Sequence, residues 1–233
     1  LNPPMYRFIV RSKTTLSGLV KEMRPWQWYK QSIVLVGLVF SGSLFNYHAV
    51  IRVLLTVIAF SFVAGSVYIF NDIVDVEEDR NHPQKRHRPI ASGQVGIPLA
   101  VVFGLGVGFS GLALASTVHY LVLLALLGYV ANNVLYNAVF KEVLFVDVLT
   151  IAVGFVLRAL AGVYAVQTSL QSPSPWLIVC TLLAALMLGF GKRYQELRIT
   201  DGVNTRTSLE EYHSTVLEQL LAVITATLLM SYS

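Results

Sequence analysis

The sequence predicts an all-α protein, a polytopic membrane helix bundle with about seven spans that form a single transmembrane domain over residues 1–233. Hydrophobic residues make up 55% of the chain and charged residues only 13%, and the mean hydropathy is +0.64. The apolar residues gather in segments close to the ~20 residues that a bilayer core requires. The basic residues gather in alternate linkers, which is typical of membrane proteins.

Of the 17 basic residues, 15 lie in the N-terminal lead-in, in 80–88, at 141 or in 192–206, and Arg52 and Arg158 are the exceptions. All 13 acidic residues follow the same split. By the positive-inside rule, the N-terminus and the linkers after the second, fourth and sixth spans are expected in the cytoplasm. The spans are expected at residues 32–46, 50–70, 97–117, 119–138, 145–167, 175–191 and 216–233.

The lead-in, residues 1–31, is basic and lacks the ~7–15-residue apolar core of a cleavable signal peptide. Arg24 and Lys30 lie among tryptophans and a tyrosine. This mixture is typical of a membrane edge, and it also suits an anionic lipid or substrate head group. The single cysteine, Cys180, excludes a disulfide within the chain.

Residues 71–93 carry five acids within the first nine residues, directly after an apolar segment. At ~100° per helical residue, one helix face would carry several oxygen ligands, while Glu77 would point the other way. Carboxylate and amide oxygens at this spacing suit Mg²⁺, which leaves positions open for substrate phosphates. The candidate metal ligands are Asn71, Asp72, Asp75 and Asp79.

Four basic residues follow the acids, and they could bind a phosphate or diphosphate; they are Arg80, Lys85, Arg86 and Arg88. In a soluble chain such a run would usually be a solvated helix end. At the end of a membrane span, acidic residues are costly and by default indicate a functional site.

The fourth span ends in three asparagines and Tyr136, so this polar face is expected to point into the bundle and to form hydrogen bonds between helices. Tyr136 and Lys141 could alternatively bind phosphate. Asp147 and Arg158 share one face of the fifth span but are three turns apart, too far for a direct bond. The third span contains Gly104, Gly106, Gly108 and Gly111, which favour close helix approach.

Residues 191–213 form the second charged segment. Lys192 and Glu196 are four residues apart and could simply pair on one helix face. Alternatively, Lys192, Arg193 and Tyr194 would form a second phosphate-binding wall on the same side of the membrane as residues 71–93. Ser208 and Glu211 have the spacing of a capping box for a short helix before the last span.

Two stretches carry a family resemblance. The pattern Asn71-Asp72-x-x-Asp75-x-x-x-Asp79, followed by Arg88-Pro89-Ile90-Ala91-Ser92-Gly93, resembles the first motif of the UbiA-type intramembrane prenyltransferase superfamily. Further matches resemble a phosphoribosyl-transferring branch of that superfamily. They are Arg24-Pro25-x-Gln27-Trp28-x-Lys30, Asp79-Arg80-x-His82-Pro83-x-Lys85-Arg86, Gly191-Lys192-Arg193-Tyr194-x-Glu196-Leu197 and Ser208-Leu209-Glu210-x-Tyr212.

The resemblance implies a glycosyltransferase of the UbiA fold that moves 5-phosphoribose from phosphoribosyl diphosphate to a polyprenyl (decaprenyl) phosphate and releases diphosphate. It implies Mg²⁺ as cofactor, an active site on the cytoplasmic side of a bacterial inner membrane, and a role in arabinan precursor synthesis for the cell wall. It also implies nine spans, whereas this sequence ends in the seventh, so it is expected to be either a portion of a longer protein or an unusually short member. The implied catalytic residues are Asp72, Asp75, Asp79 and Lys192. The implied substrate-binding residues are Arg24, Lys30, Arg80, Lys85, Arg86, Arg88, Tyr136, Lys141, Arg193, Tyr194 and Glu196.

Two alternative functions stay open. Most relatives in the superfamily transfer a prenyl group from its diphosphate and carry a second Asp-rich motif, where this chain has only Asp201 as an aspartate. That departure favours the sugar donor. A cation-coupled transporter is disfavoured, because the acids gather at one interface and no inverted repeat is visible. Membrane lipids are the expected surroundings, no nucleic-acid partner is expected, and a homo-oligomer is compatible with the apolar surface.

Overall fold

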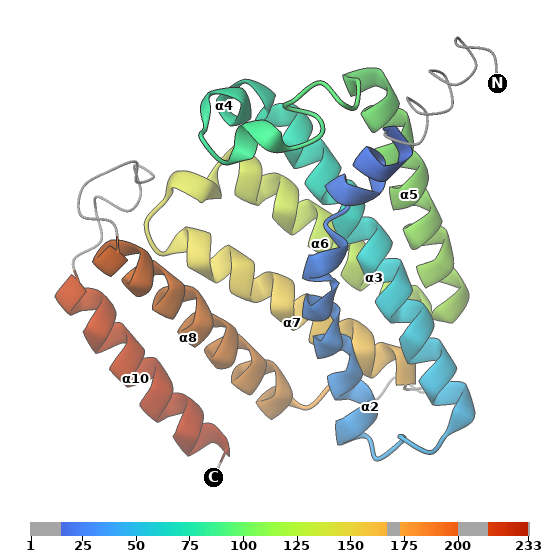
Figure 1. Ribbon diagram of the computed structural model, residues 1–233. Coiled ribbons are helices and arrows are strands. Elements are labelled where there is room, and N and C mark those ends of the chain that lie inside the picture. Colours follow the sequence, from blue (N-terminus) through green and yellow to red (C-terminus); the bar gives the residue numbers. More distant parts are fainter. Residues whose placement is uncertain (1–14, 167–172, 200–213, 233) are drawn as a thin grey trace. The chain divides into compact units, whose positions relative to one another are not determined.

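The computed structural model describes residues 15–166, 173–199 and 214–232, and within these ranges every regular element is a helix. The chain divides into two compact units. The first contains residues 1–32 and 54–118, and the second contains residues 33–53 and 119–233. Each unit is described by itself (Figure 1).

The first unit contains a helix over residues 15–22, the larger part of α3 (Tyr47–Val74), α4 (Val76–Asn81), the short η2 (Lys85–His87) and α5 (Ile97–Val118). Its core joins the lead-in helix to α3 and α5 through Leu19, Met23, Ile69 and Ala100. The loop after η2 contributes Ile90 and Val95 to the same core. The lead-in and the 82–95 loop are therefore fixed against one end of α3.

Glycines allow α5 to lie close to α3, as the sequence predicts. A Cβ on Gly111 would be 2.8 Å from the Ala59 carbonyl oxygen, and one on Gly108 would be 2.7 Å from Ser66 Oγ. Gly104 is nearly as close to Ile69, at 3.2 Å. Gly106 differs, because nothing lies within 4 Å of the Cβ position.

The second unit is built around α7 (Val146–Val166), which contacts α2 (Val36–Phe40), α6 (Tyr120–Ala138) and α8 (Pro175–Ile199). α8 in turn contacts α10 (Ser214–Tyr232), and α7, α8 and α10 lie side by side in Figure 1. The turn η3 (Phe140–Glu142) joins α6 to α7. Val148, Phe190, Leu217 and Ile224 form a core between α7, α8 and α10.

Among the residues that the structure describes, six helices are long and apolar enough to cross a membrane, and they coincide with six of the expected spans: α3, α5, α6, α7, α8 and α10. The expected first span at 32–46 is built differently. A 3₁₀-helix, η1 (Pro25–Leu35), continues into the five-residue α2. At about 2.0 Å per 3₁₀ residue and 1.5 Å per α residue, these two helices together reach about 30 Å. Hydropathy could not reveal this change, because it does not distinguish the two helix types.

Candidate active site

The acidic run lies at the junction of α3 and α4. The sequence predicts one continuous helix here, and this is wrong in detail, because α3 ends at Val74 and α4 begins at Val76. The backbone N–H of Asp75 still donates to the Asn71 carbonyl oxygen at 2.9 Å, and that of Asp79 donates to the Asp75 carbonyl oxygen at 2.8 Å. Helical spacing therefore continues through the break and brings Asp72 and Asp79 to the same side, two turns apart.

Asp72 and Asp79 are linked by one guanidinium group. Arg88 Nη1 donates to Asp72 Oδ1 at 2.8 Å and to Asp79 Oδ2 at 2.6 Å. The two acids are 2% and 1% exposed, so the positive charge of Arg88 offsets most of the cost of burying them. Burial raises the pKa of Asp79, while the neighbouring Arg88 opposes that rise.

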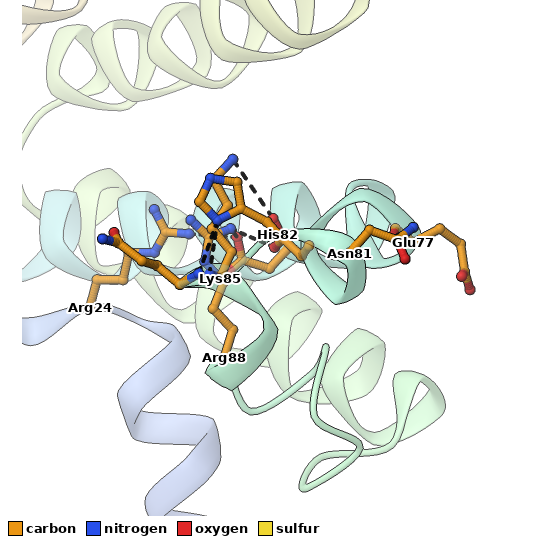
Figure 2. Close-up of polar contacts among 9 residues, drawn as sticks. Arg24, Glu77, Asn81, His82, Lys85 and Arg88 are labelled. Carbon is orange, nitrogen blue, oxygen red and sulfur yellow. Dashed lines mark hydrogen bonds and ion pairs between the residues drawn. The ribbon is translucent and has the colours of Figure 1, made fainter. Parts of the chain in front are cut away.

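Arg24 reaches the same acid from the lead-in. Its Nη2 donates to Asp72 Oδ1 at 2.5 Å, and its guanidinium lies 4.9 Å from the centre of the Tyr68 ring. In Figure 2, Arg24 and Arg88 extend from separate segments toward one place, whereas Glu77 extends away from it. Arg24 also has a φ of +52°, a left-handed conformation that is costly for a residue other than glycine. Such strain is common where a side chain is held for function.

A pocket of about 350 Å³ opens beside these groups. Its charged lining residues are Lys21, Glu22, Arg24, Asp72 and Arg88, and Trp26, Gln27, Gln84, His87 and Pro89 complete the wall. This volume is at the lower end of the range for small-molecule sites. Three basic side chains, Lys21, Arg24 and Arg88, line the pocket, so it favours an anion.

Glu22 is a site residue that the sequence interpretation missed. It is 2% exposed, and its Oε1 accepts a hydrogen bond from the Ile90 backbone N–H at 2.7 Å, which ties the lead-in to the loop that carries Arg88. Burial raises the pKa of Glu22 to about 8, and the adjacent Asp72 carboxylate contributes to the rise. Its position beside Arg24 was the only available signal, because no spacing in the sequence relates residue 22 to residue 90.

The acidic pair offers ligands of the type that Mg²⁺ prefers. Asp72 Oδ2 and Asp79 Oδ1 are buried without a hydrogen-bond partner, and both are hard oxygen donors. Within the described residues, no three His, Cys, Asp or Glu side chains gather into a ready-made metal site. A divalent ion held here would therefore complete its coordination with substrate oxygens and water, as Mg²⁺ commonly does.

The other predicted residues of the first unit have different surroundings. Arg80 donates to Glu77 at 2.7 Å on the exposed side of α4, and Arg86 donates to His87 Nε2 at 3.3 Å. Lys30 donates to Gln27 at 2.9 Å. Lys85 lies 3.9 Å from Asp79 Oδ1, close enough for an ion pair but not for a hydrogen bond. Asn71, which precedes Asp72, and Asp75, which lies between Asp72 and Asp79 in the chain, are half-buried.

The second unit contains a separate charged cluster. Arg193, which is 5% exposed, donates through Nε and Nη2 to Asp147 Oδ2 at 3.0 and 2.7 Å and through Nη1 to Glu196 Oε2 at 2.7 Å. Glu196 Oε1 lies 3.7 Å from Lys192 Nζ, so these two residues form the ion pair that their spacing left open as an alternative to phosphate binding. Arg193 thus connects α7 to α8, and Lys192, 74% exposed, is the outermost charge of the cluster.

The remaining predictions concern polar residues of α6, α7 and α8. Asn132 donates across to the Thr150 carbonyl oxygen of α7 at 3.0 Å, as expected for a face turned into the bundle. Arg158 donates to Tyr129 Oη at 3.1 Å, so it joins α6 to α7. Tyr194 donates to Glu218 of α10 at 2.6 Å. Tyr136 is half-buried on α6, and Lys141 lies in η3. The capping box at 208–211 and the match at 208–212 lie outside the described residues.

Known proteins resemble this chain in both sequence and fold. Residues 32–232 match the family model of the UbiA prenyltransferase family. Decaprenyl-phosphate phosphoribosyltransferase of Corynebacterium glutamicum is 32% identical over 95% of this chain and 68% of its own length. The protein of the same name from Mycobacterium tuberculosis is 33% identical over 93% of this chain and 73% of its own length.

Solved structures show the same architecture at lower identity. A UbiA homologue from Archaeoglobus fulgidus, solved with GPP and Mg²⁺, superposes with a TM-score of 0.72 at 18% identity, covering 92% of this chain and 76% of that one. A digeranylgeranylglyceryl phosphate synthase superposes with a TM-score of 0.69 at 20% identity, covering 90% and 76%. The fold, the six apolar helices and the sequence matches agree: the chain is an integral membrane transferase that belongs to the UbiA prenyltransferase family.

Proposed function

We propose that the protein transfers 5-phosphoribose from phosphoribosyl diphosphate to a long polyprenyl phosphate, such as decaprenyl phosphate, and releases diphosphate. The observation that carries the proposal is the pocket lined by Lys21, Arg24, Arg88 and the buried Asp72. Arg88 also bonds the buried Asp79, and one oxygen of each of the two carboxylates has no hydrogen-bond partner. Such a pocket suits the diphosphate of a donor together with a divalent ion. The relatives named for phosphoribosyl transfer, which are about one third identical to this chain, support the sugar donor.

In this proposal, Asp72 and Asp79, with Asn71 and Asp75 beside them, would hold Mg²⁺ for the donor diphosphate. When bound, the ion would neutralise charge on the leaving group. Arg24, Lys85 and Arg88 hold the diphosphate by charge-assisted hydrogen bonds and fix the direction in which it leaves. Lys192, in the second unit, is proposed to bind a further phosphate group, while Arg193 and Glu196 orient it.

The reaction needs no dedicated general base, because a polyprenyl phosphate is already anionic near neutral pH. One of its oxygens attacks C1 of the ribose, the bond from C1 to the diphosphate oxygen breaks, and diphosphate leaves with the electron pair. An in-line displacement of this kind inverts the anomeric carbon. A product with the donor's anomeric configuration would contradict this single-step mechanism.

The basic linkers support an active site on the cytoplasmic side of a bacterial-type inner membrane. If these are the substrates, the product would supply arabinan precursors for the cell wall.

A donor screen with purified protein tests the function. Radiolabelled phosphoribosyl diphosphate and radiolabelled prenyl diphosphate are each offered with Mg²⁺, the first with polyprenyl phosphate and the second with aromatic acceptors. We expect label to enter lipid only from the sugar donor and only with Mg²⁺. Transfer from prenyl diphosphate alone would instead assign the activity suggested by the GPP bound to the Archaeoglobus fulgidus homologue.

A further inference from the structure

We propose that His82 is a positioning residue, whose ring holds the turn that places Lys85 beside the acidic pair. The inference deepens the proposed function, on which it rests for the assignment of Lys85 to the donor diphosphate. Its basis is a pair of hydrogen bonds at the start of η2. His82 Nδ1 accepts from the backbone N–H groups of Gln84 at 3.2 Å and of Lys85 at 3.3 Å.

The ring satisfies donors that the turn itself cannot pair. The first N–H groups of a helical turn have no carbonyl partner within it, and a side-chain acceptor commonly takes them. Gln84, at the capping position of η2, makes no side-chain cap of its own. The His82 ring supplies that cap from two residues earlier.

The backbone of His82 reinforces the arrangement on both sides. Its N–H donates to the Asp79 carbonyl oxygen at 3.3 Å, and its carbonyl oxygen accepts from the Arg86 N–H at 3.2 Å. His82 therefore links the end of α4, which carries Asp79, to the turn that carries Lys85. Figure 2 shows the His82 ring next to Lys85.

Lys85 is the group that this cap places. Its ammonium lies 3.9 Å from Asp79 Oδ1, a buried oxygen without a hydrogen-bond partner, and its side chain is 40% exposed. At this distance Lys85 contributes charge without being fixed by Asp79 itself. The backbone turn, and hence His82, sets where the ammonium group can reach a diphosphate.

The cap requires an unprotonated nitrogen at the δ position, so the neutral ring carries its proton on Nε2. Asparagine carries Oδ1 at the same number of bonds from Cα as His Nδ1, whereas glutamine carries its oxygen one bond farther away. The variants His82→Asn and His82→Gln thus form a matched pair that keeps or displaces the acceptor. If only the size or polarity of the His82 side chain mattered, the two variants would have similar effects.

The test measures the binding of Mg²⁺ and inorganic diphosphate to the purified protein by titration calorimetry. We expect His82→Gln to raise the Kd roughly tenfold, the effect of weakening one charge-assisted contact, and His82→Asn to stay close to wild type. His48→Gln is the control, since His48 is an exposed histidine of the second unit whose ring lies edge-on to that of Tyr47. Equal effects of Asn and Gln at position 82, or none from either, would overturn the proposal.

A double-mutant cycle shows whether His82 acts through Lys85. In a Lys85→Met background, His82→Gln should add no further loss of diphosphate affinity, because the group that it positions is gone. Additive losses would show that His82 acts elsewhere and would overturn the proposal. Thermal unfolding of each variant checks that it is folded, and His82→Ala replaces the glutamine variant if the latter cannot be purified.

Failure of this inference can be told apart from failure of the proposed function. If wild-type protein binds Mg²⁺-diphosphate with the predicted variant pattern but does not transfer phosphoribose, the positioning role stands and the donor assignment falls. If phosphoribose is transferred with an unchanged KM for the donor in His82→Gln, the positioning role falls. A wild-type protein that binds no Mg²⁺-diphosphate would overturn the His82 proposal, since Lys85 would then have no diphosphate to hold.

Discussion

Individual charged residues of the first unit are held by partners far away in the chain. Glu22 bonds the backbone of Ile90, and Arg24 bonds Asp72, across separations of 68 and 48 residues. Each of these contacts removes an unpaired polar group from a buried site, where it would cost about 1–3 kcal/mol or more. The pocket is therefore defined by a few pairs whose loss can be measured one at a time.

Glu22 should make the protein less stable as the pH rises from about 4.5 to about 8. In the folded state the pKa of its carboxyl is raised to about 8, against 4.5 for the ordinary group, so the unfolded chain binds fewer protons within this window. The contribution of Glu22 to the free energy of unfolding is complete below the pKa of the unfolded state. It is lost as the pH rises through the pKa of the folded state. Glu22→Gln removes the titration and keeps an oxygen for the Ile90 N–H.

The measurement is the midpoint of thermal unfolding in detergent for both proteins across this pH range. We expect the unfolding midpoint of Glu22→Gln to rise steadily, relative to that of wild type, as the pH increases. Parallel curves would show that Glu22 is ionised in the folded protein. Glu78→Gln, an exposed change on α4, controls for the removal of a carboxylate.

Arg88→Met should lower the free energy of unfolding by about 3 kcal/mol, because it leaves Asp72 and Asp79 buried without the shared cation. Added Mg²⁺ should recover part of this loss and should stabilise the variant more than it stabilises wild type, since a divalent ion can neutralise the same two carboxylates. Thermal unfolding with and without Mg²⁺ measures both effects. Equal stabilisation of the two proteins by Mg²⁺ would argue against a metal ion at this pair. Arg86→Met, which changes an exposed arginine, is the control.

Helix packing in the second unit depends on a close backbone contact. A Cβ on Gly162 of α7 would lie 2.0 Å from the Val34 carbonyl oxygen, and one on Gly37 would lie 2.3 Å from the Gly162 carbonyl carbon. The end of η1 and the start of α2 therefore contact the backbone of α7 directly. Small residues commonly allow such close approach between helices in membrane proteins. This contact fixes the irregular first span.

Gly162→Ala should destabilise the protein, because the obstructing atoms belong to backbone and cannot move aside. The matched control is Gly106→Ala in α5, where nothing lies within 4 Å of the new Cβ. At that position the better helix propensity of alanine should leave stability unchanged or raise it by up to about 1 kcal/mol. Thermal unfolding in detergent compares the two, and equal midpoints would contradict the close contact.

The molecule as a whole is expected to expose its charged segments on the cytoplasmic side. In a cysteine-free Cys180→Ala background, a cysteine in place of Glu78 is accessible on α4. A membrane-impermeant thiol reagent should label it in inverted vesicles and not in intact cells. Labelling of intact cells would reverse the assigned orientation.

Much of this architecture could be predicted from the sequence, because it follows from local rules. A helix that crosses a bilayer needs about 20 apolar residues, so α3, α5, α6, α7, α8 and α10 are visible as runs of hydropathy. The acidic and basic motifs are equally visible, since they are contiguous. Their spacing predicts that Asp72 and Asp79 share a face, which is found. It also allows the pairing of Lys192 with Glu196, which the structure shows.

What the sequence could not supply is the choice of partners between distant segments. Three features depend on which helices pack together: the 3₁₀ form of the first span, the role of Glu22, and the bond from Arg193 to Asp147, which lies 46 residues away. Side-chain contacts of this kind arise from three-dimensional packing, in which a buried charge must be paired by whatever neighbour the fold provides. Hydropathy and motif spacing carry no information about that neighbour, whereas the tertiary structure does.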